Sequence, residues 1–162
     1  MTDVVIDTNV WAMIDKTIAD VNTAEELDCI KACQEWIKAF ISGDDRLAVD
    51  TMYKILGEYR QNIKKGGLAE QYLNRLESQP RDRIKDKEIE FDVDGYAILP
   101  DDWVFHDPSD CKFIAVSISF DPYAPIYNAT DTDWEKEKPS LQEKGLIIHE
   151  LCPDYIEVRI KS

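Results

Sequence analysis

The sequence predicts an α/β fold, a three-layer α/β/α sandwich with a short, mostly parallel central sheet. Short apolar runs alternate along the chain with segments whose apolar residues recur at helical spacing, and acidic residues follow the predicted strands. The 162 residues have 44% hydrophobic content, which is enough to build a sizeable core. We therefore expect residues 1–162 to form a single domain.

Four short apolar runs are the predicted strands of this sheet. They cover residues 4–6, 47–49, 125–127 and 145–148. Residues 155–160 alternate apolar and polar side chains, which predicts an additional strand at an edge of the sheet.

Five segments have the apolar spacing of helices. They cover residues 10–16, 23–43, 51–63, 68–76 and 111–120. The second segment has the clearest boundaries, because Thr23 and Glu26 form a capping-box pattern and Gly43 ends it. Residues 81–100 are interpreted as a peripheral hairpin that turns at Asp94 and Gly95.

Charge and apolar runs limit the classes of partner. The formal net charge is −14, which repels phosphate backbones and excludes a protein that grips nucleic acid by bulk charge. Residues 60–87 are the exception, with 8 basic and 4 acidic residues, and they are the candidate contact for a phosphate chain. Lys64, Lys65 and Lys112 are the candidate substrate-binding residues.

The four cysteines predict a reducing compartment. Cys29, Cys33, Cys111 and Cys152 contain no C-x-x-C pair, so we expect reduced thiols without zinc. No signal-peptide pattern opens the chain, and no apolar run approaches the roughly 20 residues of a membrane span. We expect a soluble, cytoplasmic protein with no membrane contact.

Acidic residues collect where the predicted strands end. Asp7 follows the first strand, Glu58 lies in the helix after the second, Asp110 begins a helix, and Asp131 and Asp133 follow the third strand. Ligands bind parallel α/β sheets at the carboxyl ends of the strands. Carboxylates that crowd there repel one another, so a shared site calls for a hard cation, Mg²⁺ or Mn²⁺.

The same blocks resemble the PIN-like nuclease family, which includes bacterial toxin ribonucleases. Residues 4–11 (VVIDTNVW) look like the family's opening strand with its Asp-Thr-Asn signature, and residues 55–59 (ILGEY) resemble the block with the second acid. Residues 110–117 (DCKFIAVS) are similar to the third block, and residues 129–134 (ATDTDW) to the fourth. Two features differ from the family: Ala129 replaces the usual Thr or Ser, and residues 81–105 form a longer insertion.

The resemblance implies a metal-dependent endoribonuclease that hydrolyses single-stranded RNA. It implies that Asp7, Glu58, Asp110 and Asp131 are catalytic and bind Mg²⁺ or Mn²⁺, with Asp133 as an additional outer ligand. We expect Asn9 to orient Asp7 through a hydrogen bond. The family setting also implies the toxin of a toxin–antitoxin or defence system, a basic antitoxin-like partner and a homodimer.

Three alternatives remain open at this level. Asp107 competes with Asp110 for the third acidic position, or it caps the following helix. An aspartate-nucleophile phosphatase or dehalogenase also places an Asp after its first strand, but such phosphatases need a second Asp where this chain has Asn9. A degenerate PIN-like protein-binding module would keep the fold without the activity. His106 and His149 have no triad partner in a recognisable motif and are interpreted as structural or surface residues.

Overall fold

The computed structural model describes residues 1–162 and has one five-stranded, all-parallel sheet. The strand order is β3-β2-β1-β4-β5, with β1 (Asp3–Ile6) in the centre. The other strands are β2 (Arg46–Asp50), β3 (Ile84–Lys87), β4 (Ile126–Asn128) and β5 (Ile148–Glu150). The predicted α/β class is therefore confirmed, and the sheet is parallel throughout.

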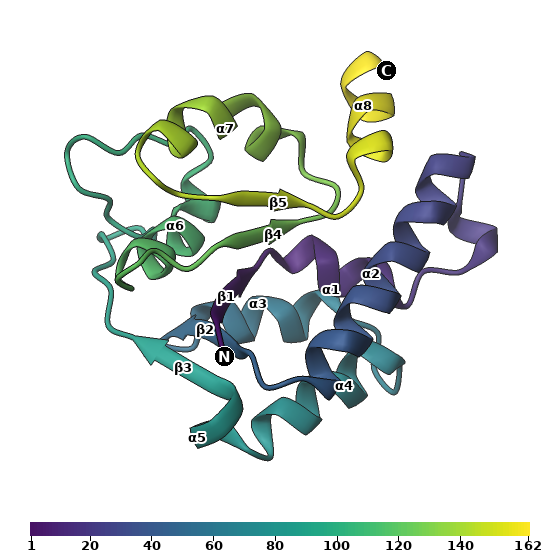
Figure 1. Ribbon diagram of the computed structural model, residues 1–162, viewed down its shortest axis with the longest axis horizontal. Helices are drawn as coiled ribbons and strands as arrows, with labels where there is room; N and C mark the ends of the chain where they lie inside the picture. Colours follow the sequence, from purple (N-terminus) through teal and green to yellow (C-terminus); the bar gives the residue numbers. More distant parts are fainter.

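Helices cover both faces of this sheet and make the three-layer α/β/α arrangement. Helices α1 to α4 lie on one side, whereas α6 and α7 lie on the other side with β5 beneath α7 (Figure 1). The helices are α1 (Thr8–Ile14), α2 (Ala24–Ser42), α3 (Lys54–Asn62), α4 (Leu68–Glu77), α5 (Pro80–Arg83), α6 (Cys111–Ile118), α7 (Thr132–Glu143) and α8 (Pro153–Lys161), with short 3-10 turns η1 (Ile18–Asp20) and η2 (Pro108–Asp110). No helix is both long and apolar enough to cross a bilayer.

Side-chain caps determine where the main helices begin. The Thr23 side chain accepts a hydrogen bond from the Glu26 backbone N–H at the start of α2, as its sequence pattern predicts. The fully buried Asp50 carboxylate accepts from the backbone N–H groups of Lys54 and Ile55, so β2 itself supplies the cap of α3. Helix α3 therefore starts at Lys54 and not at Thr51, where the predicted segment began.

One hydrophobic cluster of 39 buried residues joins the sheet to the helices. Its largest fully buried side chains include Trp11, Tyr59, Phe113 and Trp134, from α1, α3, α6 and α7. Trp11 and Tyr59 pack with ring centroids 5.5 Å apart, and the Tyr59 hydroxyl donates to the Ile6 carbonyl at 2.5 Å. These contacts fix α1 and α3 beside the carboxyl end of β1.

The structure differs from the prediction in residues 81–100. Residues 84–87 form β3, a strand that pairs in parallel with β2, with Leu47 opposite Ile84 and Asp50 opposite Lys87. The predicted hairpin is present in short form at residues 90–98: Phe91 and Ala97 form an antiparallel bridge, the Asp92 N–H donates to the Tyr96 carbonyl, and the Ile98 N–H donates to the Glu90 carbonyl. The strand was missed because backbone pairing with β2, not an apolar side-chain pattern, defines it.

Two further elements near the C-terminus differ from the prediction. The predicted edge strand at residues 155–160 is helix α8, with Pro153 in its first turn and Ile156 buried. Helix α8 packs against α2 and α7, and this packing selects a helix where the local pattern suggested a strand. The strand expected at residues 145–148 begins only at its last residue, as β5.

The expectation of four reduced thiols was also wrong. Cys29 on α2 and Cys152 at the start of α8 form a disulfide bond across 123 residues of sequence. Cys33 and Cys111 are free and buried, and the Cys33 sulfur lies 3.9 Å from that of Cys152. Because the disulfide closes a long-range contact, the spacing of cysteines in the sequence held no sign of it.

Candidate metal centre

Asp7 is placed at the carboxyl end of β1 and is the N-cap of α1. Its side chain is only 4% exposed and accepts two hydrogen bonds. The Asn9 backbone N–H donates to Oδ1 at 3.1 Å, and the Trp134 indole Nε1–H donates to Oδ2 at 2.6 Å. The carboxylate is therefore fixed by donors from two segments that are far apart in the sequence.

Asp110 and Asp131 approach Asp7 from two other segments. Asp110 ends the short turn η2 before α6, and Asp131 follows β4 as the N-cap of α7, where its Oδ1 accepts from the Asp133 backbone N–H at 2.8 Å. One carboxylate oxygen from each of the three residues lies within 4.8 Å of the other two. Three of the five predicted acids thus form one compact cluster at the carboxyl edge of the sheet.

Burial and mutual repulsion raise the pKa of two of these carboxyl groups. Burial is the main cause for Asp7, opposed by its hydrogen bonds and reinforced by the charges of Asp131 and Glu58, and its pKa rises from 3.8 to about 7. Burial and the charge of Asp7 raise the pKa of Asp110 to about 9. Ionisation of this cluster therefore costs free energy, and a bound cation would remove that cost.

Glu58 lies beside this cluster, on α3. Its Oε1 forms an ion pair with Lys112 Nζ at 2.9 Å, and its Oε2 accepts a hydrogen bond from the Thr8 hydroxyl. Glu58 lines the same pocket as the three aspartates, but its carboxylate is not within the compact cluster. Lys112 is 9% exposed, and its pairing with Glu58 occupies the ammonium that was a candidate for substrate.

The cluster opens into a pocket of about 360 Å³. Apart from the acids, its lining includes Thr8, Asn62, Thr130 and the cation Arg159 from α8. The Arg159 guanidinium donates to the Thr130 carbonyl, so α8 supplies a positive charge at the rim of an acidic pocket. Arg159 was missed because residues 155–160 were predicted as an edge strand.

Asn9 donates a hydrogen bond to Asp7 as predicted, but through its backbone N–H, and its side chain contacts a different segment. Its Nδ2 donates to Asn128 Oδ1 at 2.8 Å, and its Oδ1 accepts from the backbone N–H groups of Ala129 and Thr130. The Asn9 side chain therefore fixes the loop that carries Asp131, and only its backbone contacts Asp7. The side chain reaches β4 because β1 and β4 are adjacent in the sheet.

Asn128 and Glu150 are further members of this network that were not predicted from the sequence. Asn128 Nδ2 donates to the Asp131 carbonyl at 2.8 Å and to Glu150 Oε2 at 2.9 Å, and the Asp131 backbone N–H donates to Asn128 Oδ1. Burial raises the pKa of Glu150 to about 7. Their positions at the carboxyl ends of β4 and β5 were the available signal.

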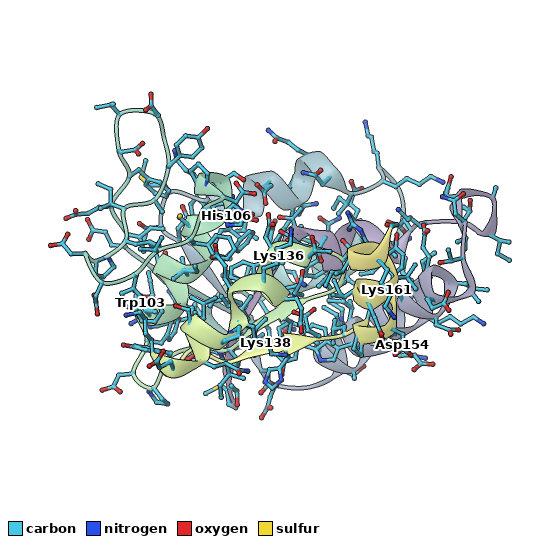
Figure 2. All side chains as sticks on the ribbon, turned by 90° about the horizontal axis from the view of Figure 1, so that it is seen from above. Trp103, His106, Lys136, Lys138, Asp154 and Lys161 are labelled. Carbon is cyan, nitrogen blue, oxygen red and sulfur yellow. A yellow bond between two sulfur atoms is a disulfide. The ribbon has the colours of Figure 1, made fainter.

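The remaining candidates lie outside the cluster. The Asp133 carboxylate faces His106 Nε2 at 3.4 Å and Lys136 Nζ at 3.9 Å, and Figure 2 labels both of these residues. His106 also contacts Glu137 at 2.5 Å, and this hydrogen bond raises the pKa of His106. Asp107 accepts from the Ser109 backbone N–H and caps η2, which is its alternative role.

Two of the three lysines predicted to bind substrate lie away from the aspartate pocket. Lys64 and Lys65 are exposed in the connection between α3 and α4, and neither lines the pocket of the three aspartates. The basic segment of residues 60–87 instead lines a different surface, beside α3.

The donor set fits a hard divalent cation. Asp7, Asp110 and Asp131 offer only oxygen ligands, which are the ligands that Mg²⁺ and Mn²⁺ prefer. Burial and mutual repulsion raise the pKa of Asp7 and Asp110, and a bound cation would favour their ionised forms. Scans of this chain against family models, curated proteins and solved structures find no match.

Proposed function

We propose that this protein is a metal-dependent endoribonuclease of the PIN-like type, which hydrolyses phosphodiester bonds in single-stranded RNA with Mg²⁺ or Mn²⁺. The observation that carries the proposal is the meeting of Asp7, Asp110 and Asp131 from three distant segments at the carboxyl edge of the sheet. The toxin-like setting, with a basic partner protein and a homodimer, belongs to the same proposal, and a net charge of −14 is complementary to a basic partner.

The three aspartates are the proposed metal ligands, and Glu58 is the fourth acid of the pocket. These residues would hold Mg²⁺ or Mn²⁺, which would supply a metal-bound water of lowered pKa and neutralisation of charge on the leaving oxygen. Trp134 and the Asn9 backbone hold the Asp7 carboxylate in one orientation, and Asn128 holds the segment of Asp131. These hydrogen bonds position the ligands before the metal arrives.

The environment of Asn9 argues against an aspartate-nucleophile phosphatase. Such an enzyme needs a general acid two residues after the nucleophile, and in this chain an amide occupies that position. Both polar atoms of the Asn9 side chain are bound to the loop of residues 128–130. The Asn9 side chain therefore supports structure and has no free group for proton transfer.

Cleavage of a labelled single-stranded RNA with Mn²⁺ tests the proposal. We expect Asp7→Asn and Asp110→Asn to lower the rate by about a hundredfold or more, because each removes a metal ligand. Asp154→Asn is the matched control, an exposed acid on α8 that Figure 2 labels, and it should cleave like the wild type.

Two results would contradict the proposal. Phosphomonoester turnover without RNA cleavage would assign the site to a phosphatase. If Mn²⁺ raised the melting temperature of the wild type by no more than it raised that of Asp7→Asn, the chain would be assigned to a protein-binding module without a working site.

A further inference from the structure

A groove lies away from the aspartate cluster, between α3 and the segment from α4 to β3. Its volume is about 700 Å³, and we call it the basic groove. Tyr53, Leu56, Gly57 and Arg60 line one wall at helical spacing, so they share one face of α3 and its start. The lining is completed by Arg46, Glu77, Pro80, Arg81, Ile84, Lys85 and Asp86.

The groove is positively charged on a strongly acidic protein. Four cations and two carboxylates line it, whereas the whole chain carries −14. Arg46 is paired with Asp3 at 2.7 Å and Arg60 with Glu77 at 2.8 Å. Arg81 and Lys85 are exposed, and no carboxylate lies within salt-bridge distance of either. Two cations are therefore free to bind an anionic ligand.

An exposed aromatic ring stands at one end of the same groove. Tyr53 is 58% exposed and has a left-handed backbone, with φ of 58°, immediately before α3. A tyrosine ring beside free cations is the combination on which bases of single strands stack while their phosphates are neutralised.

Shared lining residues connect the basic groove to the aspartate pocket along α3. A smaller hollow of about 370 Å³ lies between them, and its lining includes Lys54, Tyr96 and Lys112. It shares Gly57 with the basic groove and Glu58 with the aspartate pocket. A side-chain carbon built at Gly57 would meet no atom within 4 Å, so the surface is open at this shared residue.

We propose that the basic groove binds a segment of single-stranded RNA next to the segment that enters the aspartate pocket. Phosphates contact Arg81 and Lys85, a base stacks on Tyr53, and the strand crosses α3 at Gly57. This inference rests on the proposed nuclease function, and it answers the objection that the protein as a whole repels nucleic acid. Recognition is by charge and stacking, which are insensitive to sequence.

Binding of a fluorescein-labelled RNA of about 12 nucleotides, followed by anisotropy in EDTA, tests the groove without cleavage. We expect the double variant Arg81→Ala and Lys85→Ala to weaken binding about tenfold. The slope of log K against log salt should fall by about 1.4, because two side chains that neutralise phosphates are removed. Tyr53→Asn should weaken binding about tenfold with little change in slope, and Asn tolerates the left-handed backbone.

The matched control is the double variant Lys31→Ala and Lys38→Ala, which removes the same charge from exposed positions on α2. It should bind RNA within about twofold of the wild type, because these lysines lie outside the groove. Equal weakening by the two double variants would overturn the groove and leave only bulk charge. Absence of RNA binding by the wild type would also overturn it.

The groove and the nuclease proposal can fail separately. If the wild type cleaves RNA and the Arg81 and Lys85 variant binds and cleaves equally well, the groove is refuted and the nuclease stands. If the wild type binds RNA through Arg81, Lys85 and Tyr53 but never cleaves it with Mn²⁺, the groove stands and the nuclease is refuted. Far-ultraviolet circular dichroism of each variant verifies that the fold is kept.

Discussion

The indole of Trp134 donates a hydrogen bond of 2.6 Å to the Asp7 carboxylate, across 127 residues of sequence. Trp134 lies in the first turn of α7 and is fully buried, with Phe105 packed against its ring at 4.5 Å. The bond therefore ties the N-cap of α1 to the first turn of α7. It makes the orientation of the central carboxylate depend on the packing of α7.

Trp134→Phe should weaken Mn²⁺ binding about tenfold, since a residue that orients a metal ligand typically contributes this much. The aromatic ring is largely kept, so the fold should survive. Mn²⁺ titration by calorimetry measures the change. Trp36→Phe on α2 is the control for the same substitution away from the centre, and its affinity should equal that of the wild type. Unchanged affinity in Trp134→Phe would show that the indole does not orient Asp7.

Metal-free protein should lose stability as pH rises, and Asp7→Asn should reduce this loss. The pKa of Asp7 is near 3.8 in the unfolded chain but about 7 in the folded protein. Below both values the carboxyl group is protonated in both states. At a pH between the two pKa values, Asp7 is ionised in the unfolded chain but protonated in the folded protein. The free energy of unfolding therefore falls as pH rises through this range, and the loss is complete above pH 7.

The comparison is made by urea unfolding of the wild type and Asp7→Asn between pH 5 and pH 8 in EDTA. The free energy of unfolding of Asp7→Asn should exceed that of the wild type by an amount that grows over this range, to the order of a few kcal/mol at pH 8. Mn²⁺ should reverse the order, because only the wild type binds it. A constant difference at every pH would contradict the raised pKa.

Asn9→Ala should destabilise the protein by about 2 kcal/mol, because it leaves the Ala129 and Thr130 N–H groups and Asn128 Oδ1 without their partners. Mn²⁺ affinity should also fall, since the loop that carries Asp131 loses its anchor. Urea unfolding and Mn²⁺ titration measure the two effects. Asn74→Ala, at an exposed position on α4, should change stability by less than about 0.5 kcal/mol. Equal effects of the two variants would refute the anchor.

Arg83→Met should destabilise the protein by about 2–3 kcal/mol. The buried Arg83 guanidinium donates to the carbonyls of Phe40, Ile41 and Asp45, at and just beyond the end of α2, and methionine keeps the apolar stem without the donors. The midpoint of urea unfolding measures the loss. The neighbouring Arg81→Met removes an exposed guanidinium, so its midpoint should stay at that of the wild type. If the unfolding midpoint of Arg83→Met also equalled that of the wild type, the three carbonyls would not need the guanidinium.

Local patterns in the sequence were sufficient for the parts of the fold that they describe. The run at residues 4–6 ended as predicted at Asp7, and Thr23 and Gly43 marked both ends of α2, because caps and apolar spacing act within a few residues. The order of strands and acids also placed Asp7, Asp110 and Asp131 at one edge of a parallel sheet.

Only the tertiary structure decided which polar groups meet. The Trp134 bond to Asp7, the Asn9 contacts with residues 128–130 and the disulfide of Cys29 with Cys152 each join segments more than 110 residues apart. Helix α8 and strand β3 likewise depend on packing and pairing with distant elements. The sequence by itself determined the fold class and the acids available for a metal. Chain folding decided their orientation and their partners, because hydrogen bonds and burial between distant segments have no local signature.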